Sequence, residues 1–169
     1  MFRRQNIRRP ADHYLGQRRY FITLCSDQRH PAFADSETAA SVIDVLRQKS
    51  IENKFSVDAY TIMPDHVHIL IRGLEPGSDA LNFIFLLKQQ TTLDYRKKRH
   101  RELWQKKFYD HILRQGDHAE SVANYIWQNP VRKGMCDDPR EYPYSGSFTH
   151  DWKNLISPPE FWNPPWKEK

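Results

Sequence analysis

FSVDAYTIMPDHVHILIR, residues Phe55 to Arg72, contains two strand-like runs joined by a Pro-Asp step, and this stretch decides the fold. The first run, 55–63, alternates like a half-buried strand until Pro64-Asp65 interrupts the pattern. The second run, HVHILIR, continues as another strand. Because the two runs follow each other so closely, we expect an antiparallel hairpin.

The segment before this hairpin predicts one strand and one helix. RRYFITLCS, residues 18–26, is rich in the aromatic and β-branched residues that favour strands. Further along, Asp35 or Ser36 can cap a helix that runs to about Asn53, because apolar residues recur there with helical spacing.

The segment after the hairpin predicts a second helix and a fourth strand. Ser78 or Asp79 opens the helix ALNFIFLLKQQTTLDYRKKR, residues 80–99, whose basic end lies where the helix dipole favours positive charge. KKFYDHILR, residues 106–114, has the composition of a strand.

A third helix is expected at the end of this series. Gln115-Gly116 makes a turn, Asp117 caps a helix from His118 to about Asn129, and Pro130 stops that helix. The first six elements then follow the ferredoxin-like order of strand, helix, strand, strand, helix and strand. We therefore predict an α+β fold in which two helices cover one face of an antiparallel sheet and the third helix lies on the open face.

The rest of the chain does not predict a second domain. Residues 1–17 are rich in arginine without periodicity and predict a basic, flexible N-terminal arm. Residues 18–134 hold the expected elements, and 169 residues suffice for one core. Residues 135–169 are rich in proline and aromatic residues, and we expect them to form an irregular tail packed on the domain.

Composition favours an intracellular protein with a polyanionic partner. Lysine and arginine outnumber aspartate and glutamate by 26 to 21, and the excess is gathered in blocks, which favours nucleic acid, although a solvated basic face explains the charge as well. Cys25 and Cys136 are too few for a disulfide framework. The sequence contains neither a secretory signal nor a membrane span, so we expect a cytoplasmic location without membrane contact.

The hairpin also carries the first candidate for chemistry. Side chains alternate along a strand, so His66 and His68 project to one face while Val67 and Ile69 face the other. Two imidazoles that converge on an open face suit a metal ion. A pair of exposed or hydrogen-bonded histidines without a metal is the alternative interpretation.

The third helix supplies two further candidates. Tyr125 and Asn129 are four residues apart and therefore lie on one helical face. If that face packs over the open sheet, two nitrogens and one amide oxygen could hold a divalent ion and leave positions for water or phosphate oxygens. The alternatives are a core aromatic residue beside Ile126 and a helix-terminal asparagine chosen because Pro130 follows.

Three blocks of the sequence together resemble a known family. MPDHVHIL resembles the HUH motif (histidine, hydrophobic residue, histidine) of single-tyrosine DNA transposases. LWQKKFYDHILR followed by ANYIWQNPVRKGM is similar to the downstream block of the REP-associated tyrosine transposases, and the blocks follow the family's order. Insertion-sequence relatives tend to carry glutamine at the position of Asn129, so the asparagine resembles the REP-associated branch.

This resemblance implies a function and a site. Residues 18–134 would be the catalytic domain, and Tyr125 the nucleophile that forms a 5′-phosphotyrosine intermediate. His66, His68 and Asn129 would ligate Mg²⁺ or Mn²⁺, and the substrate would be single-stranded DNA or DNA hairpins of REP-like palindromes. Related insertion-sequence enzymes pair as dimers, whereas the long tail here could occupy the corresponding surface, which favours a monomer over a homodimer.

Basic residues along the chain are the candidates for DNA contacts. They are Arg3, Arg4, Arg8, Arg9, Arg18, Arg19, Lys88, Arg96, Lys97, Lys98, Arg99, Arg101, Lys106, Lys107, Arg132 and Lys133. Trp104 and Tyr109 could stack on unpaired bases, although Trp104 also fits a core position. His111 is a candidate base for the tyrosine or a structural histidine, and Asp65 shapes the turn or orients a histidine.

Two other functions fit part of the pattern. A nucleic-acid-binding protein of the same fold without catalytic activity explains the charge, but it does not explain why tyrosine and asparagine keep metal-site spacing with the histidine pair. A metal-dependent hydrolase of small phosphoesters explains the ligands, but it gives the arginine-rich arm no role.

Overall fold

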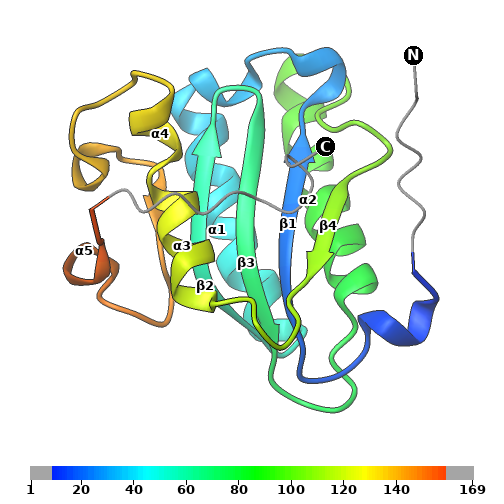
Figure 1. The fold of residues 1–169 in the computed structure, drawn as a ribbon. Helices are drawn as coiled ribbons and strands as arrows, with labels where there is room; N and C mark the ends of the chain where they lie inside the picture. The colour runs from blue at the N-terminus through cyan, green and yellow to red at the C-terminus, as the bar shows by residue number, and fades with distance from the viewer. Residues whose placement is uncertain (1–8, 159–169) are drawn as a thin grey trace, which may run out of the picture.

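The structure of the chain, a computed structural model, describes residues 9–158. Four strands and three helices follow the order expected from the sequence, and a fifth strand, which was not expected, comes after them (Figure 1). The strands and the longer helices are β1 (Arg19–Cys25), α1 (Ser36–Glu52), β2 (Phe55–Met63), β3 (His66–Gly73), α2 (Ala80–Arg99), β4 (Tyr109–Ile112), α3 (Ala119–Trp127) and β5 (Ser145–Gly146). Two short helices, α4 (Asn129–Arg132) and α5 (Trp152–Leu155), lie in the C-terminal part.

The strands form one antiparallel sheet in the order β4-β1-β3-β2-β5. Its first four positions are those of the ferredoxin-like arrangement, so the predicted fold class is confirmed. The predicted hairpin is β2 and β3, in which Met63 pairs with His66 across the Pro64-Asp65 turn.

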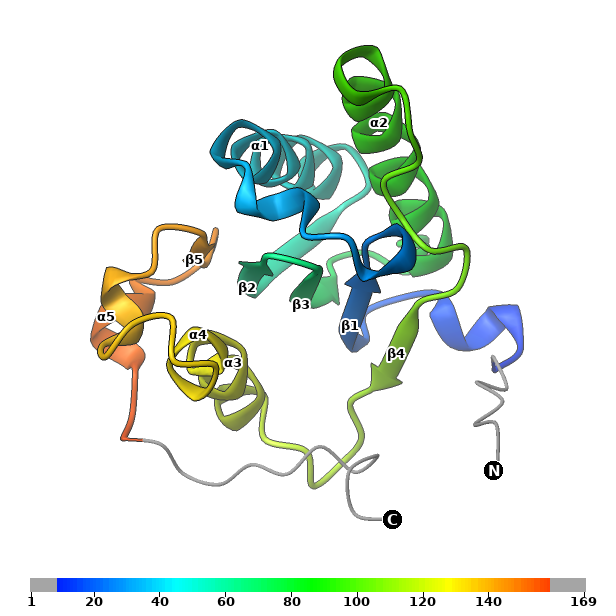
Figure 2. The same cartoon turned by 90° about the horizontal axis from the view of Figure 1, so that it is seen from above.

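The helices divide between the two faces of this sheet. Seen from above, α1 and α2 lie side by side on one face, and α3 lies on the other (Figure 2). The first core fills the space under α1 and α2, and Val67, Ile69 and Ile71 of β3 point into it. A smaller second core lies under α3 and contains Phe21, Leu70 and the buried side of that helix. Both faces are therefore covered near the centre.

Coverage of both faces changes the character of β2. Its sequence predicts a half-buried strand, but every residue from Phe55 to Met63 is buried. The cause is that α1 packs on one face of β2, while α3 packs on the other face and β5 pairs with its edge. The alternation in the sequence thus reflects two different cores rather than one core and solvent.

The helix starts follow the predicted capping chemistry in two cases out of three. Asp35 accepts a hydrogen bond from the backbone of Thr38 at the start of α1, and Asp79 accepts one from the backbone of Asn82 at the start of α2. The predicted cap Asp117 is wrong, because residue 118 is the N-cap of α3 and makes no side-chain cap hydrogen bond. The Asp117 carboxylate instead accepts a hydrogen bond from the Arg114 backbone, which closes the preceding turn.

The end segments contain more structure than the sequence indicates. Part of the predicted flexible arm packs on the domain, because Tyr14 is buried and its hydroxyl donates a hydrogen bond to Asp110 over 2.7 Å. Arg3, Arg4 and Arg8 lie outside the described residues. In the expected tail, the segment Ser145–Gly146 adds a strand to the sheet, and the hydroxyl of Tyr142 donates to the carbonyl of Ile62. The tail therefore belongs to the folded unit up to residue 158.

Two further expectations concern cysteines and membranes. Cys25 and Cys136 are free thiols, as a chain without a disulfide framework requires. Within residues 9–158, no helix has the length and apolar character needed to cross a membrane.

Candidate active site

The alternation of β3 places its two histidines on the α3 face of the sheet. Val67 and Ile69 lie in the first core, as predicted, so His66 and His68 project to the opposite side. The two imidazole rings are 4.7 Å apart between centroids and meet edge to face. Because β3 is flanked by β1 and β2, both rings are held at the centre of the sheet and not at its edge.

Each histidine ring is oriented through its Nδ1 atom. Nδ1 of His68 lies 2.8 Å from the hydroxyl oxygen of Thr23, its neighbour across the strand pair. Nδ1 of His66 lies 2.6 Å from a carboxylate oxygen of Asp65, and Arg29 pairs with the same carboxylate over 3.2 Å. With Nδ1 engaged in this way, Nε2 is the ring nitrogen through which each histidine would bind a metal ion.

Burial also sets the protonation state of His66. The pKa of its imidazole lies below the ordinary value of 6.5, because burial disfavours the charged ring more than the Asp65 carboxylate favours it. His66 is therefore neutral at neutral pH, which is the form that binds metal ions.

Helix α3 carries Tyr125 to the same place. Val122 and Ile126 are fully buried against the sheet, and this apolar side fixes the rotation of the helix. The Tyr125 ring then meets Phe21 edge to face at 6.2 Å and lies 6.3 Å from the ring of His68, between centroids. The guanidinium of Arg132 lies 4.0 Å from the centroid of the tyrosine ring, so Phe21, His68 and Arg132 are all neighbours of the phenol.

Asn129 reaches the site although the helix does not run as predicted. Helix α3 ends at Trp127 and α4 begins at Asn129, so Pro130 starts a new turn rather than stopping the old one. Gln128 keeps a helical backbone, and its backbone N–H donates a hydrogen bond to the carbonyl of Asn124 over 2.9 Å. The four-residue spacing from Tyr125 to Asn129 therefore still places both on one side.

The predicted catalytic residues line one cleft of about 660 Å³, a size suited to a ligand. Its lining contains Thr23, Cys25, Arg29, Met63, Pro64, Asp65, His66, His68, Tyr109, Tyr125, Asn129, Lys133 and Met135. Sequence reasoning missed Thr23, Cys25 and Arg29. The alternation of β1 could have found Thr23 and Cys25, because the register pairs them with His68 and His66.

The donor set in this cleft fits a divalent cation. Two imidazole nitrogens and the Asn129 amide oxygen provide the mixed nitrogen and oxygen ligands that Mn²⁺ and similar ions accept. Asn129 is only 4% exposed, and its side-chain amide has no hydrogen-bond partner within the described part of the chain. Residues 9–158 contain no cluster of three histidine, cysteine or carboxylate side chains able to hold a metal. A metal in this cleft would therefore depend on the asparagine.

The basic candidates fall into groups with different surroundings. Lys133 lines the cleft, and Arg132 donates a hydrogen bond to the backbone oxygen of Tyr125 over 2.7 Å. Arg19, at the start of β1, lies 3.6 Å from Asp58. Arg18 donates a hydrogen bond to a backbone carbonyl. The other exposed candidates are Arg9, Lys97, Arg101, Lys106 and Lys107.

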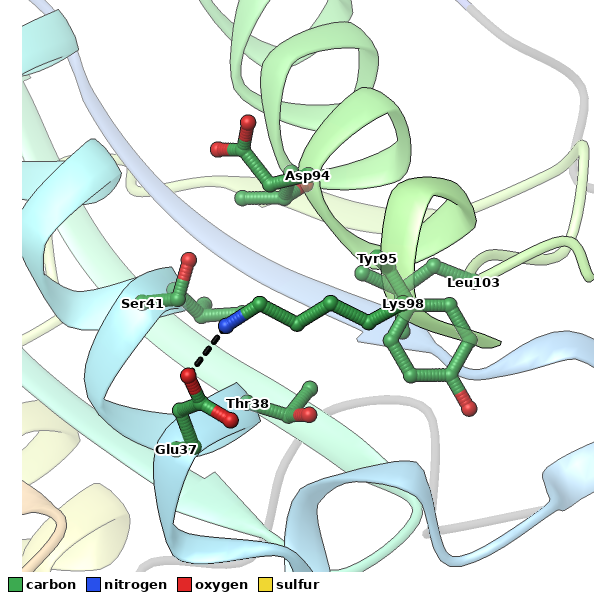
Figure 3. Close-up of a pocket in the computed structure, with 9 residues that line it drawn as sticks. Glu37, Thr38, Ser41, Asp94, Tyr95, Lys98 and Leu103 are labelled. Atoms are coloured by element: carbon green, nitrogen blue, oxygen red, sulfur yellow. Dashed lines mark hydrogen bonds and ion pairs between the residues drawn. The ribbon is translucent and has the colours of Figure 1, made fainter. Parts of the chain in front are cut away.

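The basic end of α2 is partly paired with acidic side chains. Lys98 reaches across to Glu37 on α1, as Figure 3 shows, and Arg99 pairs with Asp35 over 3.4 Å. Arg96 pairs with Glu102. This end of α2 lies in the helix layer, on the opposite face of the sheet from α3 (Figure 2).

Trp104, Tyr109 and His111 differ in how well they suit the roles considered for them. Trp104 is buried, packs on Phe33 and donates its indole N–H to Thr91, so its proposed stacking on bases is wrong. Tyr109 lines the cleft and remains a candidate for stacking. His111 lies 3.0 Å from Asp117 and is not among the described residues that line the cleft, which favours its structural interpretation.

The fold, with a histidine pair and a helix-borne tyrosine in one cleft, places the chain in the class of DNA transposases. Residues 15–129, more than half of the chain, match the family described as Transposase IS200 like, and the chain belongs to this family.

Individual relatives confirm the resemblance to REP-associated tyrosine transposases. A protein of Haemophilus influenzae assigned to that group is 27% identical over 153 residues, which cover 84% of this chain and 86% of that protein. The REP-associated tyrosine transposase of Escherichia coli is 25% identical over 134 residues, covering 72% and 79%. A solved structure of a REP-associated tyrosine transposase bound to a REP hairpin has the same fold, with a TM-score of 0.73, 21% identity and coverage of 91% and 88%.

Proposed function

We propose that this transposase binds hairpin and single-stranded REP-like DNA, and that it cleaves and rejoins the strand through Tyr125. The observation that carries the proposal is the shared cleft, which is lined by two oriented imidazoles from β3 and by a phenol and a buried amide from the consecutive helices α3 and α4. The relatives named as REP-associated tyrosine transposases support the substrate class. The related structure bound to a REP hairpin supports the choice of a hairpin.

Tyr125 is the proposed nucleophile. Its phenolic oxygen attacks the phosphorus of the scissile phosphodiester, a bond forms between these two atoms, and the bond from phosphorus to the 3′ oxygen breaks. The products are a 5′-phosphotyrosine and a free 3′-hydroxyl. Because an aryl phosphodiester is reactive, a 3′-hydroxyl can attack it in turn, restore the DNA bond and release the phenol.

The protein's contribution to this step is placement and charge. Phe21, His68 and Arg132 surround the Tyr125 ring, so the phenol is held in one orientation before DNA arrives. His66, His68 and Asn129 would hold Mg²⁺ or Mn²⁺, which when bound neutralises negative charge on the scissile phosphate. Thr23 and Asp65 keep the two imidazoles turned toward that position.

The surroundings of the cleft support an unpaired strand as the reacting segment. Lys133 and Arg29 lie in its lining and can pair with phosphates, and Tyr109 offers an aromatic face to a base. A duplex would present its phosphates on a broad cylinder, whereas the four proposed site residues line a recess between β3 and α3. In a hairpin with a single-stranded flank, the flank can enter this recess, and its phosphates can pair with Lys133 and Arg29.

We also propose that the chain acts as a monomer. The edge of β2 is paired with β5, so a second chain cannot extend the sheet at that edge without displacing Ser145 and Gly146. Helix α3 is packed on its own sheet through Val122 and Ile126, and the tyrosine therefore serves the histidines of the same chain.

Detection of protein-linked DNA tests the function. A labelled REP-like hairpin with a single-stranded flank is incubated with the full chain and Mg²⁺ or Mn²⁺, and covalent complexes are separated under denaturing conditions. The unmodified chain should form an adduct, and Tyr125→Phe should bind the hairpin without forming one. Tyr109→Phe is the matched control, because this tyrosine lines the same cleft.

Each outcome of the assay points to one interpretation. If Tyr125→Phe still formed the adduct and Tyr109→Phe did not, Tyr109 would be the nucleophile. This result would refute the assignment of Tyr125. Hairpin binding without any adduct from the unmodified chain would favour the inactive nucleic-acid-binding protein. Cleavage of a small phosphodiester without hairpin binding would favour the hydrolase.

A further inference from the structure

A second recess lies away from the active site, on the side of the molecule that carries α2. It has a volume of about 420 Å³, and its walls include Leu81, Phe85 and Gln89 of α2 and Lys106 and Phe108 of the segment before β4. We call it the α2 groove. Phe85 is 59% exposed there, which leaves most of a large aromatic ring in contact with water.

Charge in the α2 groove has one sign. Lys88 and Lys106 are among its lining residues, and no acidic residue is among the described residues that line it. The Lys88 ammonium donates hydrogen bonds to the carbonyls of Gln105 and Lys106, so Lys106 is the lysine offered to a phosphate. Lys107, the next residue along the chain, is also exposed. An accessible aromatic face beside lysines is the combination that binds an unpaired nucleotide, because the ring stacks on the base and the lysines pair with phosphates.

The groove and the active-site cleft lie on either side of the edge strand β4, because adjacent residues line them. β4 is the edge strand, and Phe108 and Tyr109 are consecutive residues at its start. Tyr109 packs with the second core and lines the cleft, whereas Phe108 packs against the first core and lines the groove. The chain between α2 and β4 passes from the helix layer to this edge (Figure 2). A strand that leaves the cleft past Tyr109 therefore meets the groove next.

We propose that the α2 groove binds the single-stranded flank of the DNA, with one base stacked on Phe85 and its phosphate paired with Lys106. The inference rests on the proposed function, because the flank reaches the groove from a hairpin held at the cleft. The cleft and the groove lie on opposite faces of the sheet, so a flank must extend beyond the cleft and around β4 before it reaches Phe85. The groove thus extends the binding site without touching the reacting phosphate.

Affinity as a function of flank length tests this inference. Dissociation constants are measured for hairpins without a flank and with flanks of about four and about twelve unpaired nucleotides, at the 5′ or the 3′ end. The unmodified chain should gain affinity with the long flank at one end. In Phe85→Ala, the factor by which the long flank raises affinity should be at least about fivefold smaller, which corresponds to the loss of one stacked base. Phe85→Trp should keep the full gain. Lys106→Gln should reduce the slope of log affinity against log salt by about 0.7 for the long flank only.

Leu93→Ala is the matched control, because Leu93 is also on α2 and 48% exposed but does not line the groove. It should behave as the unmodified chain with every DNA. A long flank that adds no affinity, or a gain that Phe85→Ala retains in full, overturns the inference and leaves the groove to a protein partner. Binding of the hairpin without a flank, and adduct formation on the hairpin with the short flank, report the proposed function separately, so the two failures are distinguishable.

Discussion

The hydroxyl oxygen of Thr23 lies 2.8 Å from Nδ1 of His68, across the pair of strands that forms the centre of the sheet. This contact holds the imidazole so that Nε2 is presented to the cleft. We expect Thr23→Val to lower the affinity for Mn²⁺ by about 10- to 100-fold, because the side chain keeps its size and loses the oxygen. Titration calorimetry with Mn²⁺ on the full chain measures the effect.

Thr23→Ser is the control for that prediction, since it retains the hydroxyl and removes only a methyl group. It should bind Mn²⁺ nearly as well as the unmodified chain. Equal affinity in Thr23→Val and the unmodified chain would show that the hydroxyl does not orient the ligand.

Arg132 and Lys133 are adjacent, but their surroundings predict different roles. Arg132 stacks on the Tyr125 ring and bonds to its backbone oxygen, so Arg132→Lys should lower the rate of adduct formation roughly tenfold through lost stacking and hydrogen bonding. The salt dependence of hairpin binding should not change, because the charge remains. Lys133→Gln should instead reduce the salt slope by about 0.7 to 0.9, since one phosphate contact is lost.

Rates from single-turnover assays and affinities at several salt concentrations separate these two roles. The assignment of Arg132 to positioning fails if Arg132→Lys leaves the rate unchanged, and the assignment of Lys133 to phosphate binding fails if its salt slope stays the same.

Asp117 links the turn before α3 to β4, and its contribution to stability should depend on pH. Burial raises the pKa of its carboxyl, but hydrogen bonds from the Arg114 backbone and from His111 outweigh burial and lower the pKa below 3.8. A carboxyl whose pKa is lowered on folding stabilises the fold above its unfolded pKa, and this stabilisation disappears as the pH falls through the folded pKa.

Asp117→Asn should therefore lower the free energy of unfolding by about 1 kcal/mol near neutral pH, and the difference should shrink below about pH 4. Urea unfolding at about pH 7 and about pH 3 checks both statements. Asp137→Asn, at an exposed position, should have little effect at either pH. A difference for Asp117→Asn that grows on acidification would reverse the sign and refute the linkage.

The sequence predicts the fold and the four proposed catalytic residues because these depend on short-range periodicity. Alternation along the strand places His66 and His68 on one face of the sheet, and helical spacing places Tyr125 and Asn129 on one side of a helix. The structure keeps both arrangements, although α3 ends before residue 128. These patterns need no knowledge of distant contacts. The resemblance then added the roles of the residues.

The features that sequence reasoning missed depend on distant partners. Asp117 satisfies the rule for a cap, but the turn beside it offers a nearer donor at Arg114. Tyr14 lies in an arginine-rich stretch, and only the fold brings it to Asp110. Two residues are too few for a recognisable strand, so β5 becomes visible only when the edge of β2 is known to be open to it. The ion pair between Lys98 and Glu37 likewise cannot be predicted from the sequence, because it forms only when α1 and α2 lie side by side.

Gly146 tests whether β5 is an integral part of the domain. It pairs with Tyr60, and a Cβ atom at this position would lie 2.5 Å from the tyrosine hydroxyl and 2.6 Å from the ring carbon that bears it. The Tyr60 ring is itself held against Phe148 at 5.0 Å between centroids, so it has little room to move aside. Gly146→Ala should therefore lower the free energy of unfolding by about 1 to 3 kcal/mol, the usual cost of overpacking.

Gly77→Ala is the matched control, because a Cβ atom there meets nothing within 4 Å, and we expect it to leave stability unchanged or raise it by up to about 1 kcal/mol. Urea midpoints at equal slope measure both variants. Equal stability of Gly146→Ala and Gly77→Ala would mean that β5 can detach from β2 without loss, and the proposal that this pairing blocks a second chain at the sheet edge would then lose its support.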